Sequence, residues 1–188
     1  MDSGGLNPKI SSMLRTQLSR IRIFQATIMT IITTLGGNLW GQPNGTLVFQ
    51  SDFGVTDSYA AIMKAVAHNV SRDIKIFDIR HNIRHFDIRE GARSLAQNVH
   101  YWPEGTVFVS VIDPGVGTPR RSVVLKTKSG HYIVSPDNGS LSLVAEKLGI
   151  AAVREIDEKV NRRAGSEKSF TFHGRDVYSY TGARLAAG

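Results

Sequence analysis

Residues 106–117 read Thr-Val-Phe-Val-Ser-Val-Ile-Asp-Pro-Gly-Val-Gly. From Thr106 to Ile112 the side chains are almost all β-branched or apolar, which is typical of a strand buried on both faces. The run ends at Asp113, where Pro114 fixes one backbone torsion and two glycines let the chain turn and approach a ligand closely. Strands of this kind occur in parallel sheets that helices cover on both sides.

Short β-branched runs alternate with amphipathic stretches on both sides of this strand. Strands are predicted over residues 46–50, 74–79, 106–112, 122–127, 132–135 and 152–156, and helices over 57–70, 87–101, 140–148 and from 180 onward. Lys128-Ser129-Gly130 separates the fourth and fifth strands, which predicts a hairpin turn and an antiparallel pair. The predicted fold class is therefore α/β, a three-layer sandwich with a mainly parallel, mixed central sheet.

The helix predicted over residues 57–70 has a polar start. Thr56 or Asp57 can accept a hydrogen bond from the first turn and so act as the N-cap. Ile62 and Met63 fall on the predicted inner face of this helix, so we expect both to be buried.

Residues 1–44 differ in composition from the rest of the chain. Three arginines, Arg15, Arg20 and Arg22, precede a mostly apolar run over 23–35, and a stretch of small and turn-forming residues follows. This order is typical of a secretory signal peptide, and the alternative is a disordered or mis-started leader. The run is too short and too polar for a membrane span. We predict a leader over residues 1–44 and one domain over 45–188, with the location open between export to the periplasm and the cytoplasm.

The composition excludes several kinds of chemistry. The chain has no cysteine, which rules out disulfides, thiolate metal sites and cysteine nucleophiles. Its net charge of +7 is spread along the sequence, and the longest basic clusters are the pairs Arg120-Arg121 and Arg162-Arg163. Because basic residues rarely alternate with aromatic ones, we expect a solvated basic surface and no nucleic-acid partner.

Acidic residues follow three of the predicted strands. They occur in Asp52-Phe53-Gly54, in Asp78-Ile79-Arg80-His81 and in the loop that begins at Asp113. Ligands of open parallel sheets bind beyond the carboxyl ends of the strands, so these loops predict one shared pocket, although turn formation alone also favours Asp and Gly there. Arg120 follows Asp113 by seven residues and can fold back to pair with it.

No metal-binding pattern accompanies these loops in the sequence. His81 and His85 are four residues apart, but the residues between them do not predict a helix and no third ligand stands nearby. We therefore expect no metal site.

The loops resemble those of the S-adenosylmethionine (SAM) hydroxide adenosyltransferases, a family related to the bacterial fluorinase and chlorinase. The resemblance extends over about residues 46–188, and the motifs occur in the family's order. They are Ser51-Asp52-Phe53-Gly54 with Asp57, Asp78-Ile79-Arg80-His81 with residues 86–92, residues 111–118 with Arg120-Arg121, Pro136-Asp137-Asn138-Gly139, and Thr171-Phe172-His173-Gly174-Arg175-Asp176.

The resemblance implies a catalytic set of Asp113, Arg120 and His173. The halogenases of the family carry tyrosine in place of Asp113 and Tyr-Ser in place of His173-Gly174, so this chain is similar to the hydrolase branch. We hypothesise that Asp113 and His173 orient a water molecule and accept its proton while Arg120 keeps Asp113 ionised. Which of the two residues is the base stays open at this point.

The resemblance also implies how the substrate is bound. Asp52 is expected to bind the ribose hydroxyls, and Phe86 and Pro114 to form walls around the ribose and the sulfonium. Asp57 and Asn138 are expected in the same pocket. The implied reaction is attack of water or hydroxide on the ribose C5′, which gives adenosine and L-methionine. It requires neither metal nor cofactor, because the sulfonium charge already activates the leaving group.

Family members continue into a C-terminal β-barrel domain and form trimers with the site between two subunits. Since the given sequence ends at Gly188, we expect the first domain without that barrel, truncated near its last helix, and a homotrimer for the full-length protein. Two alternatives to the hydrolase stay open: a SAM- or adenosine-binding domain without turnover, and a SAM-dependent halogenase. The expected partner is a small molecule, with no membrane partner beyond the predicted signal peptide.

Overall fold

A computed structural model describes residues 41–188. The leader predicted over residues 1–44 lies outside the described residues except for its last four positions. There the Gly41 N–H donates to Glu104 Oε1 at 2.7 Å, and the Asn44 N–H donates to the carbonyl of Gly105 at 3.1 Å. These contacts attach the start of the described chain to the loop that precedes the central strand.

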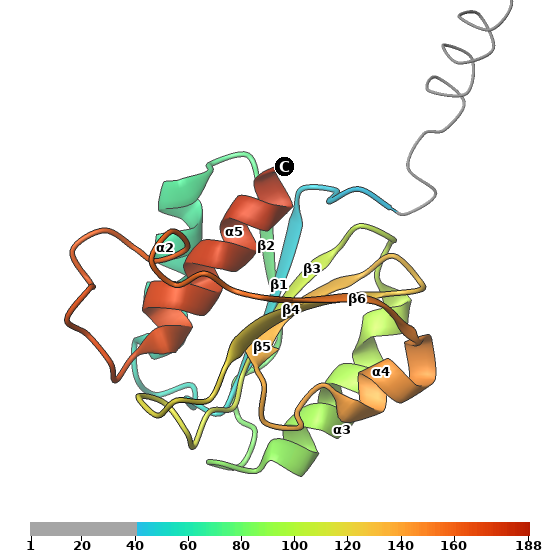
Figure 1. Ribbon diagram of the computed structural model, residues 1–188, viewed down its shortest axis with the longest axis horizontal. Coiled ribbons are helices and arrows are strands. Elements are labelled where there is room, and N and C mark those ends of the chain that lie inside the picture. Colours follow the sequence, from blue (N-terminus) through green and yellow to red (C-terminus); the bar gives the residue numbers. More distant parts are fainter. Residues whose placement is uncertain (1–40) are drawn as a thin grey trace, which may run out of the picture. The chain divides into compact units, whose positions relative to one another are not determined.

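Six strands form one mixed sheet in the order β2-β1-β3-β5-β4-β6 (Figure 1). Their bounds are β1 Thr46–Ser51, β2 Lys75–Arg80, β3 Val107–Val111, β4 Ser122–Thr127, β5 Tyr132–Pro136 and β6 Ile150–Glu155. The first four in this order run parallel, and β4 is antiparallel to both of its neighbours. The predicted hairpin around Lys128-Ser129-Gly130 is confirmed, because it joins the antiparallel strands β4 and β5.

Helices cover both faces of the sheet, which completes the predicted three-layer α/β sandwich (Figure 1). The bounds are α2 Tyr59–Val70, α3 Ile88–Asn98, the 3-10 turn η1 Val99–Tyr101, α4 Ser142–Leu148, the π-helix η2 Gly174–Ser179 and α5 Tyr180–Ala187. Helices α2 and α5 pack together on one face, while α3 and α4 pack together on the other. The fold class predicted from the alternation of strands and helices is confirmed.

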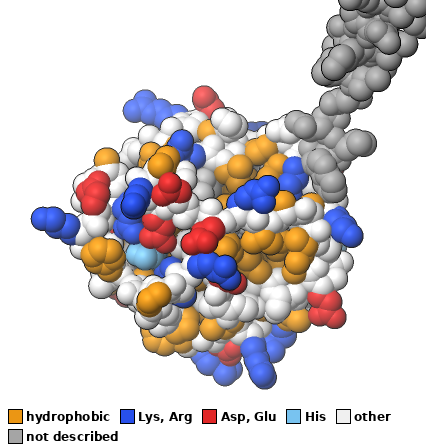
Figure 2. Space-filling model, viewed as in Figure 1, with side chains coloured by type: hydrophobic (Ala, Val, Ile, Leu, Met, Phe, Trp, Pro, Cys, Tyr) orange, Lys and Arg blue, Asp and Glu red, His pale blue; other side chains and the backbone are white. Residues whose placement is uncertain are grey.

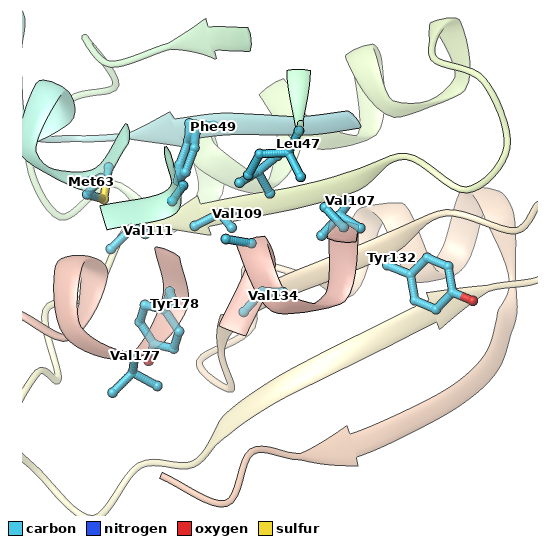
Figure 3. Packing of buried hydrophobic residues seen from close by; sticks show 14 of the residues in the cluster. Leu47, Phe49, Met63, Val107, Val109, Val111, Tyr132, Val134, Val177 and Tyr178 are labelled. Carbon is cyan, nitrogen blue, oxygen red and sulfur yellow. The ribbon is translucent and has the colours of Figure 1, made fainter. Parts of the chain in front are cut away.

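Alternate side chains of the strands supply the two halves of the core. Leu47 and Phe49 of β1 pack toward α2 and α5, beside Val109 of β3 and Met63 of α2 (Figure 3). Their neighbour Val48 points to the opposite face, toward α3 and α4. Each fully buried side chain of this size contributes about 1.5–3 kcal/mol to folding.

Helix α5 approaches the sheet at a glycine. A Cβ atom added to Gly182 would clash with Cγ2 of Val109 and lie 3.2 Å from Cδ1 of Leu47. The absence of a side chain therefore allows α5 to pack closely against the two central strands.

Several element predictions are wrong in detail. Helix α2 begins at Tyr59 rather than at residue 57, its N-cap is Ser58, and neither Thr56 nor Asp57 caps it. Ile62, predicted to be buried, is 36% exposed, whereas Met63 is buried as predicted.

The C-terminal elements also differ from the prediction. Strand β6 begins at Ile150, two residues before its predicted start, and the predicted helix from residue 180 continues directly from the π-helix η2. Nothing among the helices of residues 41–188 has the length and apolar character that a bilayer crossing requires.

Candidate active site

A pocket of about 220 Å³ opens at the carboxyl ends of β1 and β3. Its lining residues come from the loops after β1, β2 and β3 and from the segment before η2: Asp52, Phe53, His85, Phe86, Val111, Asp113, Val116, Thr171, Phe172, His173 and Gly174. Two carboxylates and two imidazoles lie among mostly apolar walls, as is usual for small-molecule sites. The loops that the sequence predicted to meet at this edge do form a single pocket, although the contribution after β2 comes from His85 and Phe86 rather than from Asp78.

Asp113 and Arg120 form a buried, two-pronged ion pair in the pocket. Arg120 Nε donates to Asp113 Oδ1 at 3.0 Å, and Arg120 Nη2 donates to Asp113 Oδ2 at 2.6 Å. The side chains are only 5% and 10% exposed, respectively. Burial alone would lower the pKa of Arg120, but the hydrogen bonds to Asp113 and nearby negative charge raise it. Two parallel hydrogen bonds fix the plane of the carboxylate as well as its charge.

His173 completes this cluster from the segment that leads into η2. It directly precedes the π-helix η2, and its Nδ1 lies 2.8 Å from Arg120 Nη2. A guanidinium only donates hydrogen bonds, so Nδ1 must act as acceptor and the ring must carry its proton on Nε2. The pKa of His173 is lowered, first by burial and then by Arg120 and Arg162, against the opposing effects of Glu158 and Asp113. The structure thus brings together the three residues that the sequence named as the catalytic set.

Asp52 lies in the same pocket and is held by the backbone of Phe86. The Phe86 N–H donates to Asp52 Oδ2 at 2.8 Å, and His85 Nδ1 is 3.6 Å from the same oxygen. Burial raises the pKa of Asp52 above its ordinary value, and Asp113 adds to the effect, while the Phe86 hydrogen bond and His85 oppose it.

The backbone at Phe86 has an unusual conformation. Its φ of 62° is left-handed, which costs about 1–2 kcal/mol for a residue with a side chain. His85 stacks against the Phe86 ring with centroids 3.8 Å apart, and the Phe86 ring is half exposed at the pocket. Strain of this kind is typical of ligand-binding segments, where the surrounding structure holds the backbone in place.

Three of the predicted substrate-binding residues do not line this pocket. Asp57 and Pro114 are exposed outside it. Asn138 supports the site from behind, since its Nδ2 donates to the carbonyl of Ile112 at 2.8 Å, next to Asp113. Direct contact of these three residues with a substrate stays a prediction.

Asp78, which the sequence predicted at the shared pocket, instead makes contacts outside it. It pairs with Lys64 at 2.7 Å and accepts from His81 Nε2 at 3.0 Å, and His81 Nδ1 lies 2.7 Å from Ser51 Oγ. Since Ser51 and His81 are buried, this Ser-His-Asp chain connects β1 to the loop after β2, behind Asp52. Within residues 41–188, no group of three or more His, Asp and Glu side chains is arranged to hold a metal ion.

Sequence reasoning missed a second group of polar residues behind the catalytic set. Arg120 Nη1 donates to Ser122 Oγ at 3.1 Å, and Ser122 Oγ donates to Glu158 Oε1 at 2.7 Å. The hydroxyl of Tyr178 is 3.1 Å from Ser122 Oγ, and burial raises its pKa above the ordinary value. These residues lie outside the loops at the strand ends, and no spacing in the sequence connects them.

Charge is mixed on the face of the molecule drawn in Figure 2. Basic side chains, in blue, are interspersed with acidic ones, in red, beside hydrophobic side chains in orange. The described part of this face shows no continuous basic stripe of the kind that binds nucleic-acid phosphates.

Comparison with known proteins identifies the family to which the sequence is similar. Residues 47–188 match the family described as SAM hydroxide adenosyltransferase N-terminal domain. The chain is 44% identical over 143 residues to the (R)-S-adenosyl-L-methionine hydrolase of Methanocaldococcus jannaschii, with 74% of this chain and 52% of that relative covered. It is 30% identical over 167 residues to the fluorinase of Actinoplanes sp., with 77% and 55% covered.

A solved structure has a fold similar to that of this chain. The crystal structure of a conserved, uncharacterized protein from Thermotoga maritima is similar, with a TM-score of 0.73 and 39% sequence identity, over 76% of this chain and 54% of that one. The chain thus spans about half the length of the relatives it matches. Since the family match extends over the whole sandwich from β1 to α5, the chain belongs to the SAM hydroxide adenosyltransferase family and contains its N-terminal domain.

Proposed function

We propose that this domain carries the catalytic residues of an enzyme that hydrolyses SAM to adenosine and L-methionine. The observation that supports this most directly is the buried cluster of Asp113, Arg120 and His173 beside the pocket. Hydrolases among the relatives are 34–44% identical to the chain, whereas the fluorinases are 29–31% identical. The proposal extends to a homotrimer of the full-length protein, because the resemblance implies that a second subunit completes the site.

In the proposed reaction a water oxygen attacks C5′ of the ribose. The C5′–S bond breaks, its electron pair returns to the sulfur, and neutral methionine leaves while the water loses one proton. Asp52 holds the ribose hydroxyls, so that C5′ and the water meet in line near Asp113. Positioning of this kind lowers the barrier because the two reactants no longer need to find each other.

Asp113 is the better candidate for the group that orients the water and accepts its proton. Its carboxylate lines the pocket and has lone pairs beyond those used by Arg120. His173 is less suited, because its Nδ1 already accepts from Arg120 and its Nε2 lies 3.4 Å from Arg162 Nη2. We therefore assign His173 the task of holding Arg120 in place while the ring itself stays neutral.

The test is to incubate the 188-residue chain with SAM and to separate the products by chromatography. Equal amounts of adenosine and methionine in chloride-free buffer support the hydrolase. A 5′-halogenated nucleoside that forms only in added chloride or fluoride would instead show a halogenase. Absence of turnover together with binding of adenosine in a calorimetric titration would show a binding domain and overturn the proposal for this chain.

The pH dependence of turnover should reflect the neutral state of His173. Because the pKa of His173 is lowered from its ordinary value of 6.5, kcat/KM should stay constant as the pH falls through 6.5 and decline only at lower pH. Protonation would place a third positive charge between Arg120 and Arg162. A decline centred at or above pH 6.5 contradicts this assignment. In His173→Gln, whose amide oxygen can still accept from Arg120, that part of the profile should disappear.

A further inference from the structure

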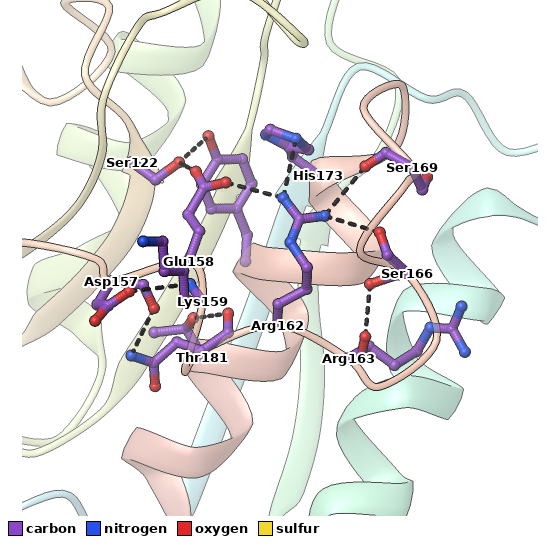
Figure 4. A network of polar contacts seen from close by, with 12 residues as sticks. Ser122, Asp157, Glu158, Lys159, Arg162, Arg163, Ser166, Ser169, His173 and Thr181 are labelled. Atoms are coloured by element: carbon purple, nitrogen blue, oxygen red, sulfur yellow. Dashed lines mark hydrogen bonds and ion pairs between the residues drawn. The ribbon is translucent and has the colours of Figure 1, made fainter.

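A second ion pair, between a buried arginine and a partly exposed glutamate, lies directly behind His173. Arg162 Nη2 donates to Glu158 Oε2 at 2.9 Å, and the side chain of Arg162 is only 9% exposed (Figure 4). The prediction of a solvated basic surface is therefore wrong for Arg162. In each arginine pair of the sequence the first side chain is buried, whereas Arg121 and Arg163 are 64% and 40% exposed.

Backbone carbonyls hold the guanidinium of Arg162 in place. Its Nη1 donates to the carbonyls of Ser166 and Ser169 at 3.3 and 3.1 Å. These contacts connect the irregular segment after β6 to the site, so the orientation of Arg162 is fixed from two sides. A surface arginine that merely contributes charge would not need this set of acceptors.

Glu158 connects the second pair to the first. Its Oε1 accepts from Ser122 Oγ, and the same Ser122 oxygen accepts from Arg120 Nη1. Together with the contacts of His173 to both arginines, these bonds close a ring of polar contacts that runs from Arg120 through Ser122, Glu158, Arg162 and His173 back to Arg120. The charged groups that face the His173 ring are thus Arg120 and Asp113 on one side and Arg162 and Glu158 on the other.

The two ring nitrogens of His173 face two guanidinium groups. Nδ1 is 2.8 Å from Arg120 Nη2 and Nε2 is 3.4 Å from Arg162 Nη2. A neutral imidazole can accept at only one nitrogen, so the shorter contact is the hydrogen bond and the longer one is a contact between like-polarised N–H groups. A second proton on the ring would be repelled from both sides, and Glu158 is the nearby anion that moderates this repulsion.

We propose that Arg162 and Glu158 are positioning residues for His173: Glu158 anchors Arg162 to Ser122, and Arg162 keeps the imidazole neutral while Nδ1 accepts from Arg120. The effect of these two residues on turnover rests on the proposed function. Neither residue touches the pocket, so both act through His173 and Arg120 on the group that orients the water. In this proposal the charges of Arg162 and Glu158 affect the protonation of His173, and their hydrogen bonds fix its surroundings.

The decisive experiment is an NMR titration of His173 in ligand-free protein, with ¹⁵N-labelled histidine and the variants Arg162→Gln and Glu158→Gln. Loss of the cation should raise the midpoint of His173, and loss of the anion should lower it. Both variants break the same Arg162–Glu158 ion pair. A purely structural role therefore predicts shifts in one direction or none, and either of those results overturns the proposal.

Activity provides the second readout. The acid limb of kcat/KM should move in the same direction as the His173 midpoint in each variant, and kcat should fall about tenfold in Arg162→Gln because Arg120 loses part of its support. Arg162→Lys keeps the charge, so its midpoint should stay close to that of the wild type. Arg121→Gln removes an exposed arginine and should change neither measurement. Since the titration needs no substrate, its outcome does not depend on turnover, so a failure of the proposed function and a failure of this inference can be told apart.

The proposal stays testable even if Arg162→Gln does not fold. Thermal unfolding identifies such a variant, and Glu158→Gln alone must then lower the midpoint of His173. An unchanged or raised midpoint in folded Glu158→Gln contradicts the proposal.

Discussion

Replacement of Asp113 by asparagine should lower kcat/KM for SAM by about a thousandfold. The carboxylate accepts two hydrogen bonds from Arg120 and lines the pocket at the same time. An asparagine has the same shape, but its amide nitrogen would turn a donor toward Arg120 or toward the water. Stopped-time assays of adenosine at several SAM concentrations measure the effect.

The matched control is Asp137→Asn. Asp137 also pairs with an arginine, Arg121, at 3.0 Å, but both side chains are largely exposed. An exposed pair contributes little, so this variant should retain wild-type kinetics and stability. If Asp113→Asn kept more than a tenth of the activity while Asp137→Asn was unaffected, another group would have to orient the water.

Asp176→Ala should lower the free energy of unfolding by about 3 kcal/mol, as expected when a buried charge network loses its central anion. The carboxylate is fully buried and pairs with Arg175 at 2.7 Å and with Arg163 at 3.1 Å. Asp176 lies within the π-helix, so its removal leaves the side chains of Arg175 and Arg163 without their shared anion there. Urea denaturation at pH 7 measures the loss, and Asp137→Ala, in an exposed pair, should lose less than about 1 kcal/mol.

The same carboxylate should make stability depend on pH. Burial alone would raise the pKa of Asp176, but hydrogen bonds from Arg175, Arg163 and Ser169 lower it below the ordinary value of 3.8. The unfolded chain then binds the proton more readily, so the stabilisation is present above about pH 4 and is lost as the pH falls through the folded-state pKa. Asp176→Ala should therefore lose stability less steeply in acid than the wild type, and equal slopes would contradict this account.

Hydrophobic pattern was sufficient to predict the sheet, because β-branched runs such as 46–50 and 106–112 must be buried on both faces. The start of α2 was not predictable, since Thr56 and Asp57 are as good caps as Ser58 and the choice depends on the loop around Gly54. The π-helix η2 was also not predictable from the sequence. Two of its side chains, those of Tyr178 and Asp176, contact residues far away in the sequence, and such contacts cannot be predicted from local periodicity.

The site was predictable where loops follow neighbouring strands. Asp52 and Asp113 end adjacent parallel strands, so the topology alone brings them to one edge of the sheet. His173 was assigned only by resemblance, because it reaches Arg120 across 53 positions of sequence. Glu158 and Arg162 had no comparable signal: an acidic and a basic residue four apart in a polar segment resemble any exposed pair.

The π-helix between His173 and α5 has a consequence for how the sequence can change. A π-turn contains about one residue more than an α-turn, and each helical residue corresponds to a rotation of about 100°. Deletion of one residue within Gly174–Ser179 would let the segment wind as a continuous α-helix, and His173 would keep about its present direction relative to α5, which Gly182 holds against the sheet. A deletion between Tyr180 and Gly182, where no wide turn absorbs it, would instead rotate His173 by about 100° away from Arg120, although every polar side chain of the site was still encoded.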